Sequence, residues 1–225
     1  MKHYALPVVA LAVFGMVGAA PSFADTKTNQ IVNGDFNTTP ALAAGNWGDF
    51  SNGTVAGWTG SAGLIEIDTA GAIGPGINQF SSQSLEVNAN SPETVTQTIT
   101  GLTVGQTYVL QFAYGDRPTS GDESMSVLLN GVVITTEVDN FFANTPSLVW
   151  HDDGYAITAS STTETLSFEG LSDSGQPSFG NEVTDVALIA TPEPSTWLLM
   201  LSGIGLVGFA AWRRSGTAMP NPSAL

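Results

Sequence analysis

Short stretches in which polar and apolar residues alternate, separated by turn-forming residues, run through the middle of this chain. Residues 95–100 and 107–112 are rich in β-branched and aromatic side chains and alternate with the period of a half-buried β-strand. Further stretches of this kind are 31–36, 64–68, 83–88, 126–129, 132–134, 155–159, 164–169 and 183–189. Many short strands at regular spacing, with few helical repeats, predict an all-β fold built as a β-sandwich of two packed sheets.

Asn130 and Gly131 lie between two of these predicted strands. Both residue types tolerate a positive φ, which the tight turn of a two-residue β-hairpin requires. We therefore predict that residues 126–129 and 132–134 are adjacent antiparallel strands.

The chain contains no cysteine, which excludes disulfide bridges, thiolate catalysis and thiolate metal sites. Residues 25–191 contain 19 acidic residues and two basic ones, Lys27 and Arg117, which gives a formal net charge of −17. Such a domain repels nucleic acid, anionic lipid and acidic polymers. Divalent cations and neutral sugars are compatible partners, and an acidic surface also keeps an exported protein soluble. Arg117 is expected to form a structural ion pair.

The first residues have the pattern of a secretory signal. Lys2 and His3 precede the apolar residues 5–20, and small side chains stand at Ser22 and Ala24. We predict cleavage by signal peptidase after Ala24; an uncleaved N-terminal anchor is the alternative.

The last part of the chain combines a proline-rich peptide, an apolar run and a basic pair. Pro192-Glu193-Pro194 holds the backbone extended, residues 197–212 are almost wholly apolar, and Arg213-Arg214 follow. As a helix the apolar run is about 24 Å long, somewhat short of a hydrocarbon core of roughly 30 Å. We predict a transmembrane helix over 197–212 with the arginines on the cytoplasmic side.

This three-part tail resembles the PEP-CTERM sorting signal of Gram-negative bacteria. The resemblance implies export, transient retention in the inner membrane, recognition by an exosortase-type transpeptidase, and release to the cell surface or the extracellular matrix. An ordinary C-terminal membrane anchor is the alternative. The expected organisation is a signal peptide (1–24), a β-sandwich domain (25–191), the sorting signal (192–214) and a cytoplasmic trailer (215–225).

The order of motifs between the two ends is similar to that of galactose-binding-like jelly-roll domains, which include carbohydrate-binding modules. The motifs are Ile-Val-Asn-Gly-Asp-Phe at 31–36, Val-Ala-Gly-Trp at 55–58, Ser-Leu-Glu-Val at 84–87, Gly-Gln-Thr-Tyr-Val-Leu-Gln-Phe at 105–112, and Val-Thr-Asp-Val-Ala-Leu at 183–188. The resemblance implies a jelly roll of two sheets that binds carbohydrate.

The same resemblance implies a structural calcium ion where the first strand meets the last. On this chain the matching positions are Asp35, Asn37 and Asp185. Oxygen ligands of these types suit calcium. The alternative is that Asn33-Gly34 forms a turn and Asp35 is a solvated edge residue.

A sugar site needs an exposed aromatic face with polar groups at its rim. Trp47 and Phe50 lie in a polar, glycine-rich segment that we expect to be a loop, and Tyr114 is a candidate for the rim. Trp58, which precedes a predicted strand, is expected in the core. Residues 151–153 are expected to form an exposed polar turn.

The sequence shows little catalytic equipment. His151 is the only histidine after the predicted cleavage site, and a Gly-x-Ser-x-Gly motif is absent from the chain. Carboxylates that could form a glycosidase pair are Glu66, Asp68, Asp122, Glu123, Asp152 and Asp153. An acidic chain offers such pairs by chance, so we predict that the protein is not an enzyme.

The predicted function is that of an exported, noncatalytic surface or matrix protein that binds the exopolysaccharide of a biofilm. Two alternatives remain at this point. One is a structural matrix or floc protein bridged by calcium without a defined sugar site, and the other is a polysaccharide hydrolase.

Overall fold

The computed structural model describes residues 28–38, 40–69, 71–73, 81–117, 123–139, 148–171, 179–192 and 194–215. The predicted signal peptide with Ala24, as well as Asp122, Glu193 and residues 216–225, lie outside the described residues.

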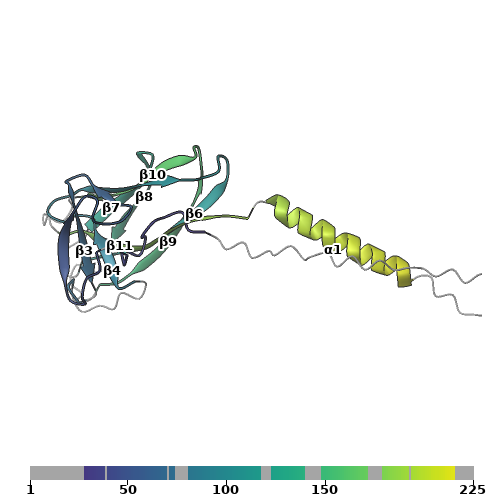
Figure 1. Cartoon of the computed structure of the whole chain (residues 1–225), viewed down its shortest axis with the longest axis horizontal. Helices are drawn as coiled ribbons and strands as arrows, with labels where there is room; N and C mark the ends of the chain where they lie inside the picture. Colours follow the sequence, from purple (N-terminus) through teal and green to yellow (C-terminus); the bar gives the residue numbers. More distant parts are fainter. Residues whose placement is uncertain are drawn as a thin grey trace, which may run out of the picture.

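Two antiparallel sheets pack against each other (Figure 1). The six-stranded sheet has the order β1 (Trp47–Ser51), β3 (Leu64–Thr69), β4 (Gln83–Glu86), β11 (Asn181–Ala190), β6 (Thr107–Asp116) and β9 (His151–Thr158). The five-stranded sheet has the order β2 (Thr59–Gly60), β5 (Thr94–Thr100), β10 (Thr163–Leu171), β7 (Glu123–Leu129) and β8 (Val132–Asp139). The predicted all-β fold of two packed sheets is confirmed.

The strands from β4 to β11 pair in a nested order. β4 pairs with β11, β5 with β10, β6 with β9 and β7 with β8. The innermost pair is therefore the β7–β8 hairpin, and the outermost pair joins the first and last strands of this series. Pairs alternate between the two sheets. This nested arrangement is that of a jelly roll, which closes a long antiparallel chain around one core.

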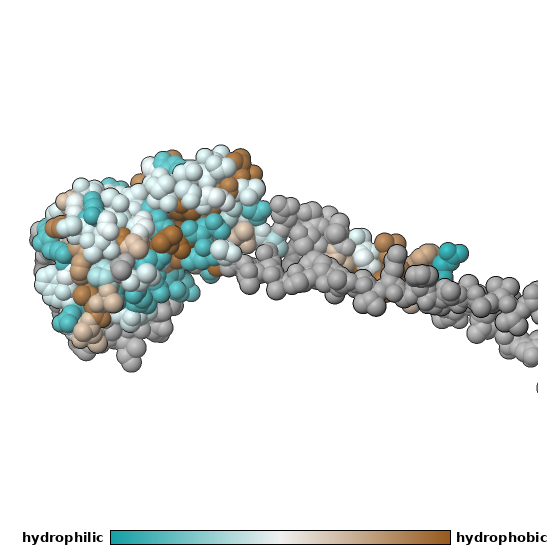
Figure 2. Space-filling model, in the orientation of Figure 1, coloured by the Kyte–Doolittle hydropathy of each residue, from teal (hydrophilic) through white to brown (hydrophobic). Residues whose placement is uncertain are grey.

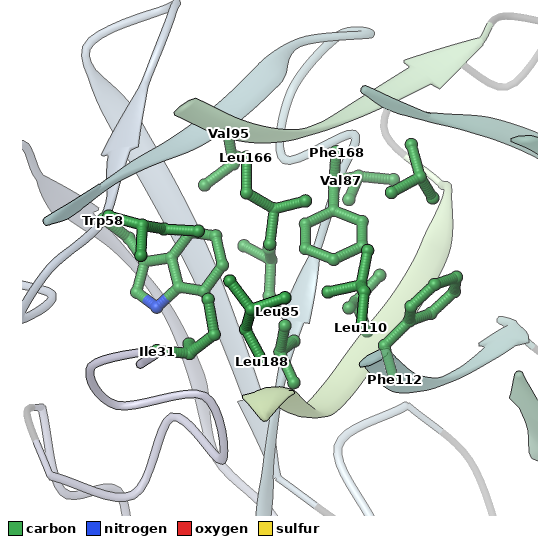
Figure 3. Packing of buried hydrophobic residues seen from close by; sticks show 14 of the residues in the cluster. Ile31, Trp58, Leu85, Val87, Val95, Leu110, Phe112, Leu166, Phe168 and Leu188 are labelled. Atoms are coloured by element: carbon green, nitrogen blue, oxygen red, sulfur yellow. The ribbon is translucent and has the colours of Figure 1, made fainter. Parts of the chain in front are cut away.

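The core consists of apolar side chains that point toward one another from the two sheets (Figure 3). Trp58 is 1% exposed, and its ring centroid lies 5.3 Å from that of Phe36 and 6.0 Å from that of Phe168. Its indole N–H donates to the carbonyl of Asn33 at 3.1 Å, so the polar atom of a buried ring is satisfied. The prediction that Trp58 belongs to the core is confirmed.

Residues 31–36, predicted as the first strand, instead form bends and a turn. Asn33 and Phe36 have φ values of 51° and 57°, which an extended strand cannot contain. The segment still reaches the last strand, because the N–H of Val186 donates to the carbonyl of Gly34 at 2.9 Å. The strand prediction at 31–36 is therefore wrong, although its place beside β11 follows the expected meeting of first and last segments.

Two predicted irregular segments are strands. β1, expected as a loop, pairs with β3 from Trp47 to Ser51, and β9 begins at His151, where we expected an exposed turn. Both segments contain polar residues and glycine, which favour a loop or turn. In both, pairing with the neighbouring strand stabilises the extended conformation against this local preference. The predicted hairpin at Asn130-Gly131 is confirmed, with φ values of 51° and 76° between β7 and β8.

The helix α1 (Pro194–Ser215) begins at a proline and lies apart from the β-sandwich (Figure 1). Residues 200–213 are all exposed, and apolar residues of this helix are visible on the molecular surface (Figure 2). A helix over 197–212 is therefore present as predicted. Among the described residues, no helix is both long and apolar enough to cross a membrane.

Candidate functional sites

The outer face of the six-stranded sheet carries glutamates at matching positions in three neighbouring strands. Glu66 in β3 lies opposite Glu86 in β4, and Glu86 lies opposite Glu182 in β11. The next residues along β4 and β11 face the core, so these glutamates point away from it. Asp68 follows Glu66 by two residues and shares its face. We call Glu66, Asp68, Glu86 and Glu182 the acidic cluster.

The acidic cluster is compact and closed to solvent. One carboxylate oxygen from each of Glu66, Asp68 and Glu86 lies within 4.8 Å of the others, and all four residues of the cluster are at most 2% exposed. Like charges side by side in a sheet repel one another, and burial removes the water that would screen them. The cluster therefore needs protons or cations to be stable.

Arg117, directly after β6, supplies one positive charge. Its Nη1 donates to Glu86 Oε2 at 2.6 Å and lies 3.9 Å from Glu66 Oε1, while the ring of Phe179 lies 4.7 Å from the guanidinium carbon. The N–H of Gly180 donates to the second oxygen of Glu86 at 3.0 Å. Arg117 thus forms the structural ion pair expected from the sequence.

The pKa values of the cluster show the effect of burial. Burial, followed by the charge of Asp68, raises the pKa of Glu66 to about 8. Burial, followed by the charge of Glu66, raises the pKa of Glu86 to about 10 even though Arg117 lowers it. Burial also raises the pKa values of Asp68 and Glu182. Arg117 alone does not balance this group of carboxylates.

Two members of the cluster receive no hydrogen bond from a nitrogen or hydroxyl group. Both carboxylate oxygens of Asp68 and both of Glu182 are buried without such a donor among the described residues, and the groups within bonding reach of Asp68 are the carboxyls of Glu182 and Glu86, which donate only when protonated. Ser84, opposite Asp68, lies near Glu182, but its buried Oγ does not reach it with hydrogen-bonding geometry. Buried acceptors in this state are rare in folded proteins and call for a ligand or proton.

The outer face of the five-stranded sheet contains a second candidate site. Thr94, Thr96 and Thr98 alternate along β5 and face away from the core, and Thr96 Oγ1 lies 3.0 Å from Ser167 Oγ in β10. These threonines line a groove with a volume of about 590 Å³ together with Gly57, Thr59, Gly60 and Ser61. We call it the threonine groove; its described lining residues carry hydroxyl and backbone groups and no charge.

The structure separates the aromatic residues predicted to bind sugar. Trp47 in the edge strand β1 is 56% exposed, whereas Phe50 in the same strand is half-buried and packs against the core. Tyr114 is buried, with its ring centroid 6.0 Å from that of Phe112 and 5.4 Å from that of His151. Contrary to expectation, Tyr114 presents no stacking face to solvent, so Trp47 is the exposed member of the three.

The predicted calcium ligands lie near the point where the N-terminal segment meets β11. Asp185 has a φ of 52° at an irregularity of β11, and burial, then the charges of Asp152 and Asp35, raises its pKa. Asn37 lies beside Asp35: its main-chain N–H and its side-chain amide donate to the two carboxylate oxygens of Asp35 at 3.2 and 3.3 Å, and the amide also donates to Ser81 Oγ at 2.8 Å. The structure therefore brings Asp35 and Asn37 together and places Asp185 within electrostatic reach of Asp35.

Comparison with known proteins identifies the C-terminal segment. Residues 190–215 match the PEP-CTERM protein-sorting motif, as the sequence predicted for 192–214. The motif implies an exported protein that an exosortase-type system recognises. The fold and the motif together define an exported β-sandwich protein with a C-terminal sorting signal.

A curated relative matches most of the chain. Halomucin of Haloquadratum walsbyi is 25% identical over 203 residues, which are 85% of this chain. The chain spans only 2% of the length of halomucin, so the match concerns a small part of that protein.

Solved structures with related architecture include carbohydrate-binding and other proteins. A cyclase from Fischerella sp. TAU is 13% identical over 72% of this chain and 96% of its own, with a TM-score of 0.48. A family 35 carbohydrate-binding module from Clostridium thermocellum is 12% identical over 64% of this chain and 96% of its own, with a TM-score of 0.39. These superpositions are too loose to assign a function.

Proposed function

We propose that this protein is a noncatalytic surface or extracellular-matrix protein of a Gram-negative bacterium and that its β-sandwich binds the carbohydrate of an exopolysaccharide. The PEP-CTERM motif supports the route out of the cell. The threonine groove supports the binding activity, and it is the observation that carries the proposal.

The groove has the volume and the chemistry for neutral sugar residues. Its volume of about 590 Å³ lies in the range of ligand sites, roughly 300–1,000 Å³. Each threonine or serine hydroxyl both donates and accepts a hydrogen bond, as sugar hydroxyls do. The described lining is uncharged although residues 25–191 carry a net charge of −17, so a neutral polymer meets no local repulsion there.

The environment of the carboxylates supports a noncatalytic role. Glu66, Asp68 and Glu123, three of the residues considered for a glycosidase pair, are closed to solvent, so a glycan cannot reach them without opening the fold, whereas Asp152 and Asp153 in β9 are not buried. His151 lies in β9 with its ring 5.4 Å from that of Tyr114.

Affinity electrophoresis of the full chain against a panel of neutral and acidic bacterial polysaccharides, with and without calcium, tests the proposal. We expect retardation by a neutral polysaccharide. The variant T59A/T98A removes two groove hydroxyls and should weaken binding about 5- to 30-fold. The matched control T100A/T163A removes two exposed hydroxyls that do not line the groove and should bind like the wild type.

Absence of retardation by every polysaccharide in both conditions would overturn the proposal. Loss of binding in W47A, with binding kept in T59A/T98A, would place the sugar site on β1 instead of the groove. Calcium-dependent aggregation without selectivity among glycans would favour a structural matrix protein, and release of sugar products would show a hydrolase.

A further inference from the structure

We infer that the acidic cluster is a binding site for one divalent cation, with the ligand chemistry of Ca²⁺. The ligands are carboxylate oxygens of Glu66, Asp68 and Glu182, next to the Glu86–Arg117 ion pair. This site differs from the one predicted at Asp35, Asn37 and Asp185, and it does not depend on carbohydrate binding in the threonine groove.

The distribution of hydrogen bonds within the cluster is the first argument. Glu86 has a donor on each oxygen, from Arg117 and from Gly180. Asp68 and Glu182 are 0% exposed, and none of their four carboxylate oxygens accepts a hydrogen bond from a nitrogen or hydroxyl group among the described residues. Carboxylates buried without a donor are strongly unfavourable, and a cation is the ligand that can serve several of them at once.

The charge balance is the second argument. Fully ionised, the four carboxylates and the guanidinium of Arg117 would carry a net charge of −3 in a volume closed to water, and the raised pKa values of Glu66 and Glu86 show that without a cation protons take up part of this charge. Arg117 is directed to Glu86, at 2.6 Å, and is 3.9 Å from Glu66. A divalent cation at the other carboxylates reduces the net charge to −1.

The nature of the donor atoms favours calcium. The cluster offers only oxygen atoms, which suit hard cations. One carboxylate oxygen each of Glu66 and Asp68 lies within 4.8 Å of the other, so both can reach one ion, and Asp68 is within electrostatic reach of Glu182. Mg²⁺ gives up its bound water reluctantly, so a site closed to water suits Ca²⁺ better. Ser84 adds a buried neutral oxygen on the same face.

The position of the cluster indicates what the ion would do. Among the described residues, β4 pairs with β11 through two residue pairs, Glu86 with Glu182 and Leu85 with Val183, and the N–H of Val87 adds one bond to the carbonyl of Asn181 at 3.1 Å. This short ladder joins β1, β3 and β4 to the rest of the six-stranded sheet. A cation shared by β3 and β11 strengthens the sheet where its hydrogen bonding is weakest.

Thermal unfolding and isothermal titration calorimetry of the EDTA-treated full chain test the inference. We expect 1 mM CaCl₂ to raise the Tm by at least about 5 °C, calorimetry to give about one ion per chain, and MgCl₂ to have a smaller effect. The variants E182Q and D68N keep side-chain size and remove a charge, so both should abolish the calcium response. The control E164Q changes a buried carboxylate of β10 that is bonded to Ser160, and it should keep the response.

Several outcomes would overturn the inference. One is a wild-type chain with neither a calcium-dependent Tm nor binding heat. Another is a calcium response that persists in E182Q and D68N, or one that is lost in D185N and kept in D68N, which would place the ion at the N-terminal segment. Should one of the two cluster variants fail to fold, the other variant together with the wild-type calorimetry decides.

Discussion

Trp58 and Trp47 are the same residue type in opposite surroundings. Trp58 is 1% exposed and contacts Phe36 and Phe168 in the core, whereas Trp47 is 56% exposed on an edge strand. We expect W58A to lower the free energy of unfolding by about 3–5 kcal/mol, because it leaves a large cavity. W47A should lower it by less than about 1 kcal/mol. Urea denaturation of both variants measures the difference, and equal losses would contradict this placement of the two rings.

Glu93 gives the stability of the domain a dependence on pH. It is buried; its Oε2 accepts a hydrogen bond from the N–H of Ala62 at 3.3 Å, and its Oε1 has none among the described residues. Burial raises its pKa to about 7, partly offset by the Ala62 N–H. The folded state therefore binds this proton more tightly than the unfolded state. The stabilisation is complete below the unfolded pKa of 4.5 and is lost as the pH rises through about 7.

The variant E93Q stays neutral at every pH and should separate this contribution from the others. We expect it to be more stable than the wild type by about 1 kcal/mol at pH 8, a magnitude reduced for partial screening by solvent. At pH 5 the two proteins should be about equally stable. Chemical denaturation at pH 5, 6, 7 and 8 measures the two curves, and parallel curves would show that Glu93 does not titrate as described.

At the scale of elements, the β7–β8 hairpin depends on its turn. Gly131 has a φ of 76°, which a side chain tolerates poorly. G131A should lower the free energy of unfolding by about 1 kcal/mol. The matched control is G154A in β9, where φ is not positive and an added methyl group would meet its nearest atom at 3.7 Å. Hydrogen exchange in β7 and β8 would show whether the loss is local, and equal costs for the two variants would contradict the role of the turn.

The elements that could be predicted from sequence are those whose pattern is local. Along β5, Val95, Gln97 and Ile99 face inward between outward threonines, so alternation alone defines the strand. Residues 31–36 also contain β-branched and aromatic side chains, but their conformation depends on distant partners: the side chain of Gln97 bonds the main chain of Val32 at 2.8 and 2.9 Å. No local pattern contains that contact.

The candidate sites, too, depend on contacts between distant residues that a local sequence pattern does not contain. Alternation at 85–87 indicates that Glu86 faces away from the core, yet only the register of β3, β4 and β11 brings Glu66, Glu86 and Glu182 together. The sequence indicates Glu66 and Asp68 as carboxylates available for a glycosidase pair, whereas nothing in the local pattern singles out Glu86 and Glu182. The threonines of β5 were visible as a repeated pattern, whereas the groove they line depends on Gly57 and β2.

At the scale of the whole molecule, the contacts of the β-sandwich extend to Thr191, the second residue of the sorting motif, and most of the motif lies beyond them. The N–H and the Oγ1 of Thr191 both donate to the carbonyl of Thr107 at 2.9 Å, and residues 200–213 are exposed. We expect truncation after Pro192 to change the Tm by less than about 2 °C. The truncated protein should nevertheless fail to reach the cell surface, which fractionation of expressing cells measures. A large loss of Tm would show that α1 supports the fold, and normal sorting would show that the motif is dispensable.

The nested pairing of the strands determines how the domain responds to mechanical load. β11 lies inside the six-stranded sheet, with β4 on one side and β6 on the other, and it leads directly into the sorting motif. Backbone hydrogen bonds in an antiparallel sheet run across the strands. Tension applied along the axis of β11 from its C-terminal end therefore shears these bonds together instead of opening them one after another, so a domain held at this end resists being pulled apart by flow.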